Sequence, residues 1–129
     1  GGTPKMWALT DALLKNNREA FLTTLAGLEN DPEQAPLAFV GMAAKQVRHL
    51  LAIHGLLAQG LSRREIQPKQ VDPKMLPFQM SNLLSAMPAW PEPKVRRAIG
   101  CLYNLDLALK GDPGTAWGRV ERHLLSLFT

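Results

Sequence analysis

The chain has 129 residues, a mass of 14.2 kDa and a formal net charge of +4, which is the size of one ordinary domain. Hydrophobic residues make up 46% and charged residues 20%, close to globular averages, so the composition excludes wholesale disorder. No apolar run approaches the roughly 20 residues that cross a bilayer, and a single cysteine, Cys101, excludes an intrachain disulfide. We therefore expect one domain in the reducing interior of a cell.

Helix-forming residues dominate the composition. Leu and Ala together number 37, whereas the β-branched Val and Ile together number 8. Proline and glycine divide the chain into segments of helical length. These features predict an all-α fold, a compact bundle of six to seven helices.

The start of the chain lacks a methionine and a signal pattern. We interpret residues 1–5 as a cloning scar or linker and residues 6–129 as a single helical domain. The first two helices are predicted over residues 5–15 and 17–28, with Asn17 as the N-cap of the second. We expect these two helices to form a helical hairpin.

The third predicted helix, over residues 33–59, is the longest. Apolar residues form two adjacent stripes along it and cover about half of its circumference. Lys45, Arg48 and Gln59 fall on the remaining face. A helix that is apolar over so wide an arc must pack on two sides, so we expect it at the centre of the bundle.

Short elements follow Gly60. Ser62 and Glu65 have the spacing of a capping box for one or two turns that Pro68 ends. Prolines on both sides of Trp90 predict a stiff crossing, and Asp112 with Pro113 predicts the start of the last helix. The remaining helices are expected over residues 73–86, 94–110 and 112–127.

The sequence contains no recognisable catalytic or cofactor site. A phosphate-binding loop and a nucleophile elbow are both missing. His49 and His54 are five residues apart, about 140° around a helix, whereas a shared metal face needs a spacing of three or four. We predict no catalytic residue, no metal ligand and no cofactor.

One carboxylate lies in an unusual position. Asp106 falls at the edge of the apolar face of its helix, where it needs a partner. Lys110 is one helical turn away, and Arg48 also borders an apolar face. We predict that these three residues form a structural buttress, with Arg48 and Asp106 holding the two long helices in register. A contact from Asp106 to a neighbouring protein is the alternative.

Several strings, in this order and spacing, resemble the C-terminal domain of the delta subunit of the bacterial DNA polymerase III clamp loader. Together they extend over nearly the whole chain. The strings are WALTDALL (7–14), QVRHLL (46–51), LSRREI (61–66) and LYNLDLALKG (102–111). Residues 67–73 are richer in proline than is usual in that family.

The resemblance implies a helical collar domain, the third of three in the delta subunit. Its role would be to hold delta beside the motor subunits and delta prime in a pentameric loader that places the sliding clamp on DNA during replication. Contact with the clamp would belong to the missing N-terminal domains, and contact with DNA would be at most indirect. The implied location is the cytoplasmic, nucleoid-associated replisome of a bacterium.

A collar domain needs outer surface that packs against its neighbours. Tryptophan, methionine and arginine are favoured at such interfaces. The candidate interface residues are Phe78, Met80, Met87, Trp90, Arg96 and Arg97. For the four apolar members, packing at the end of the domain's own core is an equal alternative.

The basic residues suggest a second class of function. Residues 45–97 contain nine basic and three acidic residues, a net charge of +6. A helical nucleic-acid-binding domain would use Arg63, Arg64, Lys69 and Lys74 on phosphates in an imitation of a helix-turn-helix. Against this alternative, the presumed recognition helix is apolar where polar residues should read bases.

Overall fold

The computed structural model describes residues 3–31, 33–111 and 116–128, and within these ranges the chain forms seven α-helices and no strand. The all-α prediction is confirmed. No helix in the described ranges is long and apolar enough to cross a membrane. The helices are α1 (Pro4–Leu14), α2 (Arg18–Glu29), α3 (Pro36–Ala58), α4 (Pro68–Val71), α5 (Pro77–Ala86), α6 (Glu92–Gly111) and α7 (Ala116–Leu124), with 3-10 turns η1 (Met87–Ala89) and η2 (Leu125–Leu127).

Proline begins four of these helices. Pro4, Pro36, Pro68 and Pro77 each occupy the first helical position, where the missing N–H removes no intrahelical bond. Pro68 was expected to end a helix and instead begins α4, and the helix expected from residue 73 begins at Pro77. α1 begins within the segment that we interpreted as scar or linker. The predicted start signal of the last helix, Asp112 and Pro113, lies outside the described residues.

Two helices end in left-handed residues. Asn16 (φ 57°) follows α1 and Gly60 (φ 100°) follows α3. After α3, the Gly60 N–H donates to the Leu57 carbonyl and the Leu61 N–H donates to the Leu56 carbonyl, which is the Schellman pattern. The predicted cap of α2 is confirmed, since the Asn17 side chain accepts from the Ala20 N–H.

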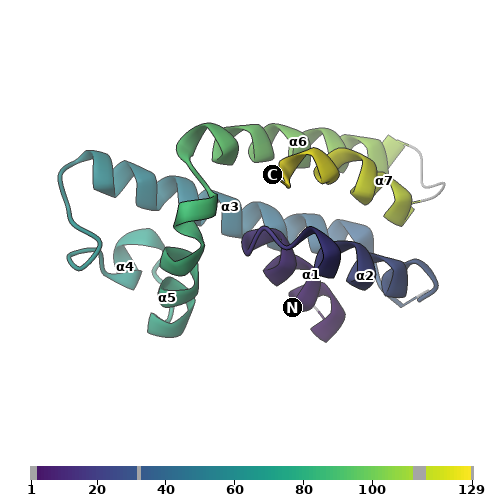
Figure 1. Cartoon of the computed structure of the whole chain (residues 1–129), viewed down its shortest axis with the longest axis horizontal. Coiled ribbons are helices and arrows are strands. Elements are labelled where there is room, and N and C mark those ends of the chain that lie inside the picture. The colour runs from purple at the N-terminus through teal and green to yellow at the C-terminus, as the bar shows by residue number, and fades with distance from the viewer. Residues whose placement is uncertain (1–2, 32, 112–115, 129) are drawn as a thin grey trace.

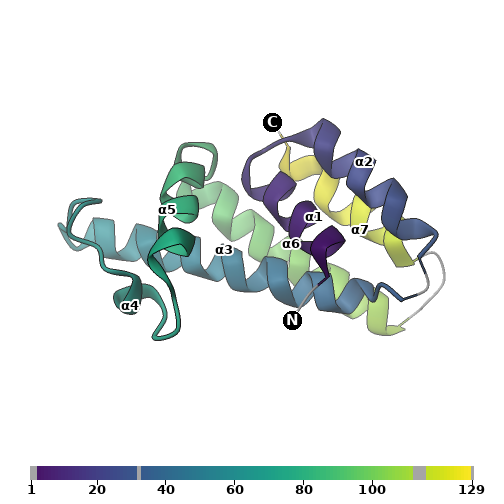
Figure 2. The ribbon, with the colours of Figure 1, turned by 90° about the horizontal axis from the view of Figure 1, so that it is seen from below.

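The two long helices, α3 and α6, run antiparallel at the centre (Figure 1). α1 and α7 pack against them at one end, and α2 packs against α1 and α7 (Figure 2). We call α1, α2, α3, α6 and α7 the five-helix bundle. Residues 61–89, which contain α4 and α5, lie against the C-terminal part of α3, and we call them the α4–α5 arm.

The core confirms that α3 is the central helix. α3 buries six side chains, Phe39, Val40, Ala43, Val47, Leu50 and Ile53. Two aromatic contacts join elements that are far apart in the sequence. The ring centroids of Phe39 on α3 and Trp117 on α7 are 6.3 Å apart, and those of Phe21 on α2 and Phe128 after η2 are 4.8 Å apart. The α7 end of the chain is therefore packed against both α2 and α3.

Trp90 lies between the arm and α6 and contacts three helices of the bundle. Its side chain is fully buried, and its Nε1–H donates to the Leu14 carbonyl over 2.8 Å. Its own carbonyl lies 2.7 Å from Nε2 of His54 on α3. The buried Lys94 places Nζ 4.4 Å from the Trp90 ring centroid and donates to Oδ1 of Asn16. One residue thus joins the end of α1, the C-terminal part of α3 and the start of α6.

Candidate functional site

Within the described residues, no group of three or more His, Cys, Asp or Glu side chains is placed to hold a metal ion. The two histidines of α3 have separate partners. His49 lies 3.0 Å from an Asp72 carboxylate oxygen, whereas His54 contacts the Trp90 carbonyl. The candidate sites described below are grooves on the surface of the domain.

The predicted pair between Arg48 and Asp106 does not form. Asp106 instead pairs with Lys110 on its own helix, with 2.9 Å between Nζ and Oδ2. Among the described residues, Arg48 has no ion pair, and it is exposed on α3. An intrahelical pair one turn long satisfies Asp106 without crossing to α3, so we expect that the register of the two helices does not depend on this carboxylate.

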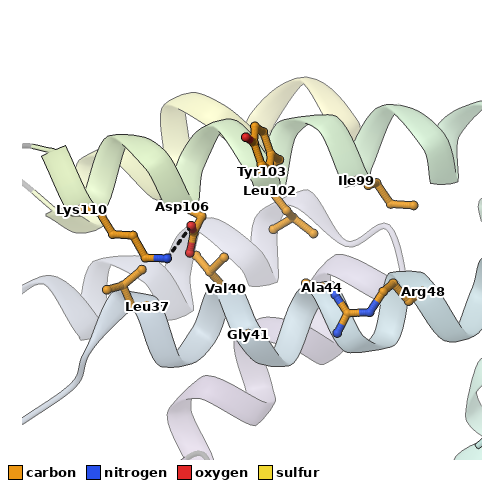
Figure 3. Close-up of a pocket in the computed structure, with 10 residues that line it drawn as sticks. All are labelled: Leu37, Val40, Gly41, Ala44, Arg48, Ile99, Leu102, Tyr103, Asp106 and Lys110. Atoms are coloured by element: carbon orange, nitrogen blue, oxygen red, sulfur yellow. Dashed lines mark ion pairs between the residues drawn. The ribbon is translucent and has the colours of Figure 1, made fainter.

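Arg48, Asp106 and Lys110 nevertheless share one site, a groove between α3 and α6 with a volume of about 520 Å³ (Figure 3). Val40, Ala44, Ile99 and Leu102 provide much of its apolar lining. The residues that line this α3–α6 groove are Leu37, Val40, Gly41, Ala44 and Arg48 on α3 and Ile99, Leu102, Tyr103, Asp106 and Lys110 on α6.

Helical spacing explains why these residues meet. On α3, residues 37, 41, 44 and 48 recur every three or four positions and so share one face. Residues 99, 103, 106 and 110 do the same on α6. Gly41 and Ala44 add little side-chain volume, and an added Cβ at Gly41 would meet no atom within 4 Å. The small residues leave the space between the two helices open.

The rim of the α3–α6 groove combines exposed apolar groups with charge. Leu37 is 41% exposed and Tyr103 is 64% exposed, although both are large apolar or aromatic side chains. The Asp106–Lys110 pair is internally neutral, so Arg48 supplies the net positive charge of the lining. Figure 3 shows Arg48 extended along α3 towards Ala44, without reaching the Asp106–Lys110 pair.

A second uncovered surface lies between α1 and α5. Trp7 is 47% exposed and Phe78 is 62% exposed, and they line a groove with a volume of about 500 Å³. Its α3 contribution, Gln46, is five residues from Gly41 and thus about 140° around the helix from the α3–α6 groove. We call it the Trp7 surface. The two surfaces lie on different sides of α3.

Sequence reasoning missed Trp7 and Tyr103. Each falls outside the apolar stripe of its helix, and that mismatch was the available signal: a large aromatic residue on a face that the core does not use. In a sequence read alone, one aromatic residue on a polar face is not distinguishable from an isolated surface residue.

Of the six interface candidates, two are buried inside this chain. Met80 is 4% exposed and Trp90 is 0% exposed, so both pack in the domain's own core, which was the alternative to an interface role. The interface assignment of these two residues is withdrawn. Phe78, Arg96 and Arg97 are exposed, and Met87 is half-buried. Arg96 already bonds Glu92 across one helical turn. The four remaining residues stay predictions.

The basic residues do not form a helix-turn-helix. Residues 63–65 form a turn, α4 has four residues, and Lys74 lies outside α5. Arg63 and Lys69 donate to carbonyls of their own chain, those of Leu84 and Pro73. The motif that the nucleic-acid alternative requires is therefore not present in the described residues.

One polar contact fastens the arm to α3. The Lys74 N–H and the His49 ring both bond the Asp72 carboxylate, and these bonds, the backbone one first, hold the pKa of Asp72 below its ordinary value. Nδ1 of His49 is buried without a hydrogen-bond partner. The contact orients the segment between α4 and α5 against the central helix.

Comparison with known proteins identifies one family. A family model described as "DNA polymerase III delta subunit, C-terminal domain" matches residues 3–125. Neither the curated proteins nor the solved structures contain a match. The family match extends over all seven helices of the described chain.

Proposed function

The chain belongs to the family formed by the C-terminal domain of the DNA polymerase III delta subunit, and on that premise we propose that it is a non-catalytic assembly domain of the clamp loader. Its role is to hold a delta subunit among its neighbours so that the complete loader can place the sliding clamp on DNA. The family match over residues 3–125 is the observation that carries this proposal.

The surface of the domain supports an assembly role. Large apolar side chains are exposed at two grooves, one between α3 and α6 and one around Trp7. Exposed apolar patches on a small domain commonly mark protein interfaces. A subunit within a ring has a different neighbour on each side and therefore needs two different surfaces. The two grooves meet that requirement.

The partners that we propose are the motor subunits and delta prime. Contact with the sliding clamp belongs to other domains of the delta subunit, and contact with DNA is indirect. The proposed location is the cytoplasm, at the replisome. The basic residues of the 45–97 segment then face solvent and acidic neighbours. Two of the four candidate phosphate ligands, Arg63 and Lys69, donate to carbonyls of their own chain.

Sedimentation velocity tests the proposal. The chain closes its own core, so it can be studied in isolation. Mixed with the motor subunits and delta prime, it should sediment as part of a larger complex. Mixed with duplex or single-stranded DNA, it should sediment alone over a range of salt concentrations. Failure to join any loader subunit, together with tight DNA binding that weakens steeply with salt, would overturn the proposal.

A further inference from the structure

We propose that the α3–α6 groove binds one helix of a neighbouring loader subunit, and that this helix carries an apolar stripe and a carboxylate that pairs with Arg48. This inference rests on the proposed function and adds to it the surface and the chemistry of the partner. It concerns the groove whose ten lining residues are given above.

The shape of the groove fits a helix. Its walls are two antiparallel helices, and a third helix packs naturally along the space between two others. From Leu37 to Arg48, α3 rises about 16 Å, so about three turns of a partner helix would contact the groove. The apolar lining is continuous along this length through Val40 and Ala44 on α3 and Leu102 and Ile99 on α6.

The charge of the groove specifies one feature of its occupant. Lys110 already neutralises Asp106 at 2.9 Å, whereas Arg48 has no ion pair among the described residues. A partner that buries this end of the groove must bring negative charge, since an unpaired cation is costly to remove from water.

The same charges argue against a second copy of the chain as the occupant. In a two-fold symmetric dimer, a second copy would present its own α3–α6 groove, whose one carboxylate, Asp106, is already paired with Lys110. It would therefore bring a second Arg48 without a free carboxylate to meet the first. A different chain that supplies an acidic helix satisfies Arg48 directly.

The first test fills the groove from within the chain. A Cβ at Gly41 meets no atom within 4 Å and the residue is exposed, so we expect Gly41→Leu to enter the groove without lowering the melting temperature of the free domain. Gly27→Leu is the matched control, since Gly27 lies on α2, is exposed and also has nothing within 4 Å of an added Cβ. Both variants are made in the delta subunit that carries this domain.

The second test reverses one charge. Arg48→Glu should repel the acidic partner helix, and Arg64→Glu makes the same change on the exposed turn of the arm, outside the groove. Affinity for the remaining loader subunits is measured by titration with a labelled delta subunit. We expect Gly41→Leu and Arg48→Glu to weaken assembly by about tenfold or more, and both controls to change it by less than about twofold.

The outcomes separate this inference from the proposed function. If Gly41→Leu and Arg48→Glu assemble like the unmodified subunit, the groove is not the docking site, while the assembly role stands. If the free chain forms a dimer that Gly41→Leu abolishes, a second copy occupies the groove and an acidic helix of another subunit does not. If the unmodified subunit does not assemble, the proposed function itself fails.

Discussion

In the five-helix bundle, helices far apart in the sequence cover one another's apolar faces, whereas the α4–α5 arm is held largely by bonds between near neighbours. Three N–H groups in the arm, those of Ser62, Gln67 and Leu76, each donate to a side chain three residues later. The bundle instead depends on contacts such as that of Trp90 with the Leu14 carbonyl, 76 residues away.

The difference predicts unequal stability. The arm contributes only a thin layer of buried side chains, such as Ile66, Met75 and Leu83, over α3. Regions with few buried contacts open locally at a lower free energy than the core. We therefore expect the arm to open without unfolding the bundle.

Trp90→Ala should have the largest effect, because Trp90 is fully buried where α1, α3 and α6 meet, next to the end of the arm. Loss of a fully buried indole and its bond to Leu14 should reduce the free energy of unfolding by about 3 to 5 kcal/mol. Chemical denaturation measures the change. The exposed Trp7→Ala is the control and should cost much less; equal losses for the two variants would refute the role of Trp90.

Gly60→Ala should destabilise the start of the arm. Gly60 has a φ of 100°, which an alanine adopts only with strain, at a cost of about 1 kcal/mol or more. Hydrogen exchange should show faster opening of residues 61–72 than of the bundle. Gly55→Ala, inside α3 with open space around its Cβ, is the matched control and should stabilise the chain slightly. Loss of stability in the control alone would contradict this account.

Acid should loosen the arm through Asp72. The folded-state pKa of Asp72 lies below its ordinary value of 3.8, because the Lys74 N–H and then His49 stabilise the carboxylate. Its contribution to stability is therefore complete above the unfolded-state pKa and is lost as the pH falls through the folded-state pKa. Asp72→Asn should lower the melting temperature near neutral pH, and the difference from the unmodified chain should shrink in acid. A difference that does not change with pH would exclude this role.

Asp106→Asn should have the smallest effect. The pair with Lys110 spans one turn of α6 and its lysine is 61% exposed, so its loss should cost only about 0.3 to 0.5 kcal/mol. Thermal denaturation of the isolated chain tests this value. A loss several times larger would show that Asp106 does buttress the two long helices.

Much of the bundle was predictable because apolar stripes and capping residues both indicate its helices. The stripe of α3 that contains Phe39, Leu50 and Ile53 gave both its length and its central position, and Asn17 marked the start of α2. The arm was less predictable because a proline between short segments can end one helix or begin the next. Pro68 does the second. The choice depends on tertiary contacts that a sequence pattern does not contain.

The candidate site was predictable only in part. Arg48 and Asp106 were recognised as polar residues beside apolar faces, and the structure places both in one groove. Their pairing was wrong because Lys110 satisfies Asp106 within its own helix. The burial of Lys94 beside Trp90 was missed, since its contacts with Asn16 and Trp90 join segments that no helical periodicity relates.

The solvent exposure of Tyr103 reports whether a partner covers the α3–α6 groove. Tyr103 is 64% exposed on the rim of the α3–α6 groove in the free chain. Hydroxyl-radical footprinting reports the solvent exposure of its ring in the free delta subunit and in the assembled loader. If a partner helix fills the groove, oxidation of Tyr103 falls severalfold on assembly. Oxidation at the same rate in both states would contradict it.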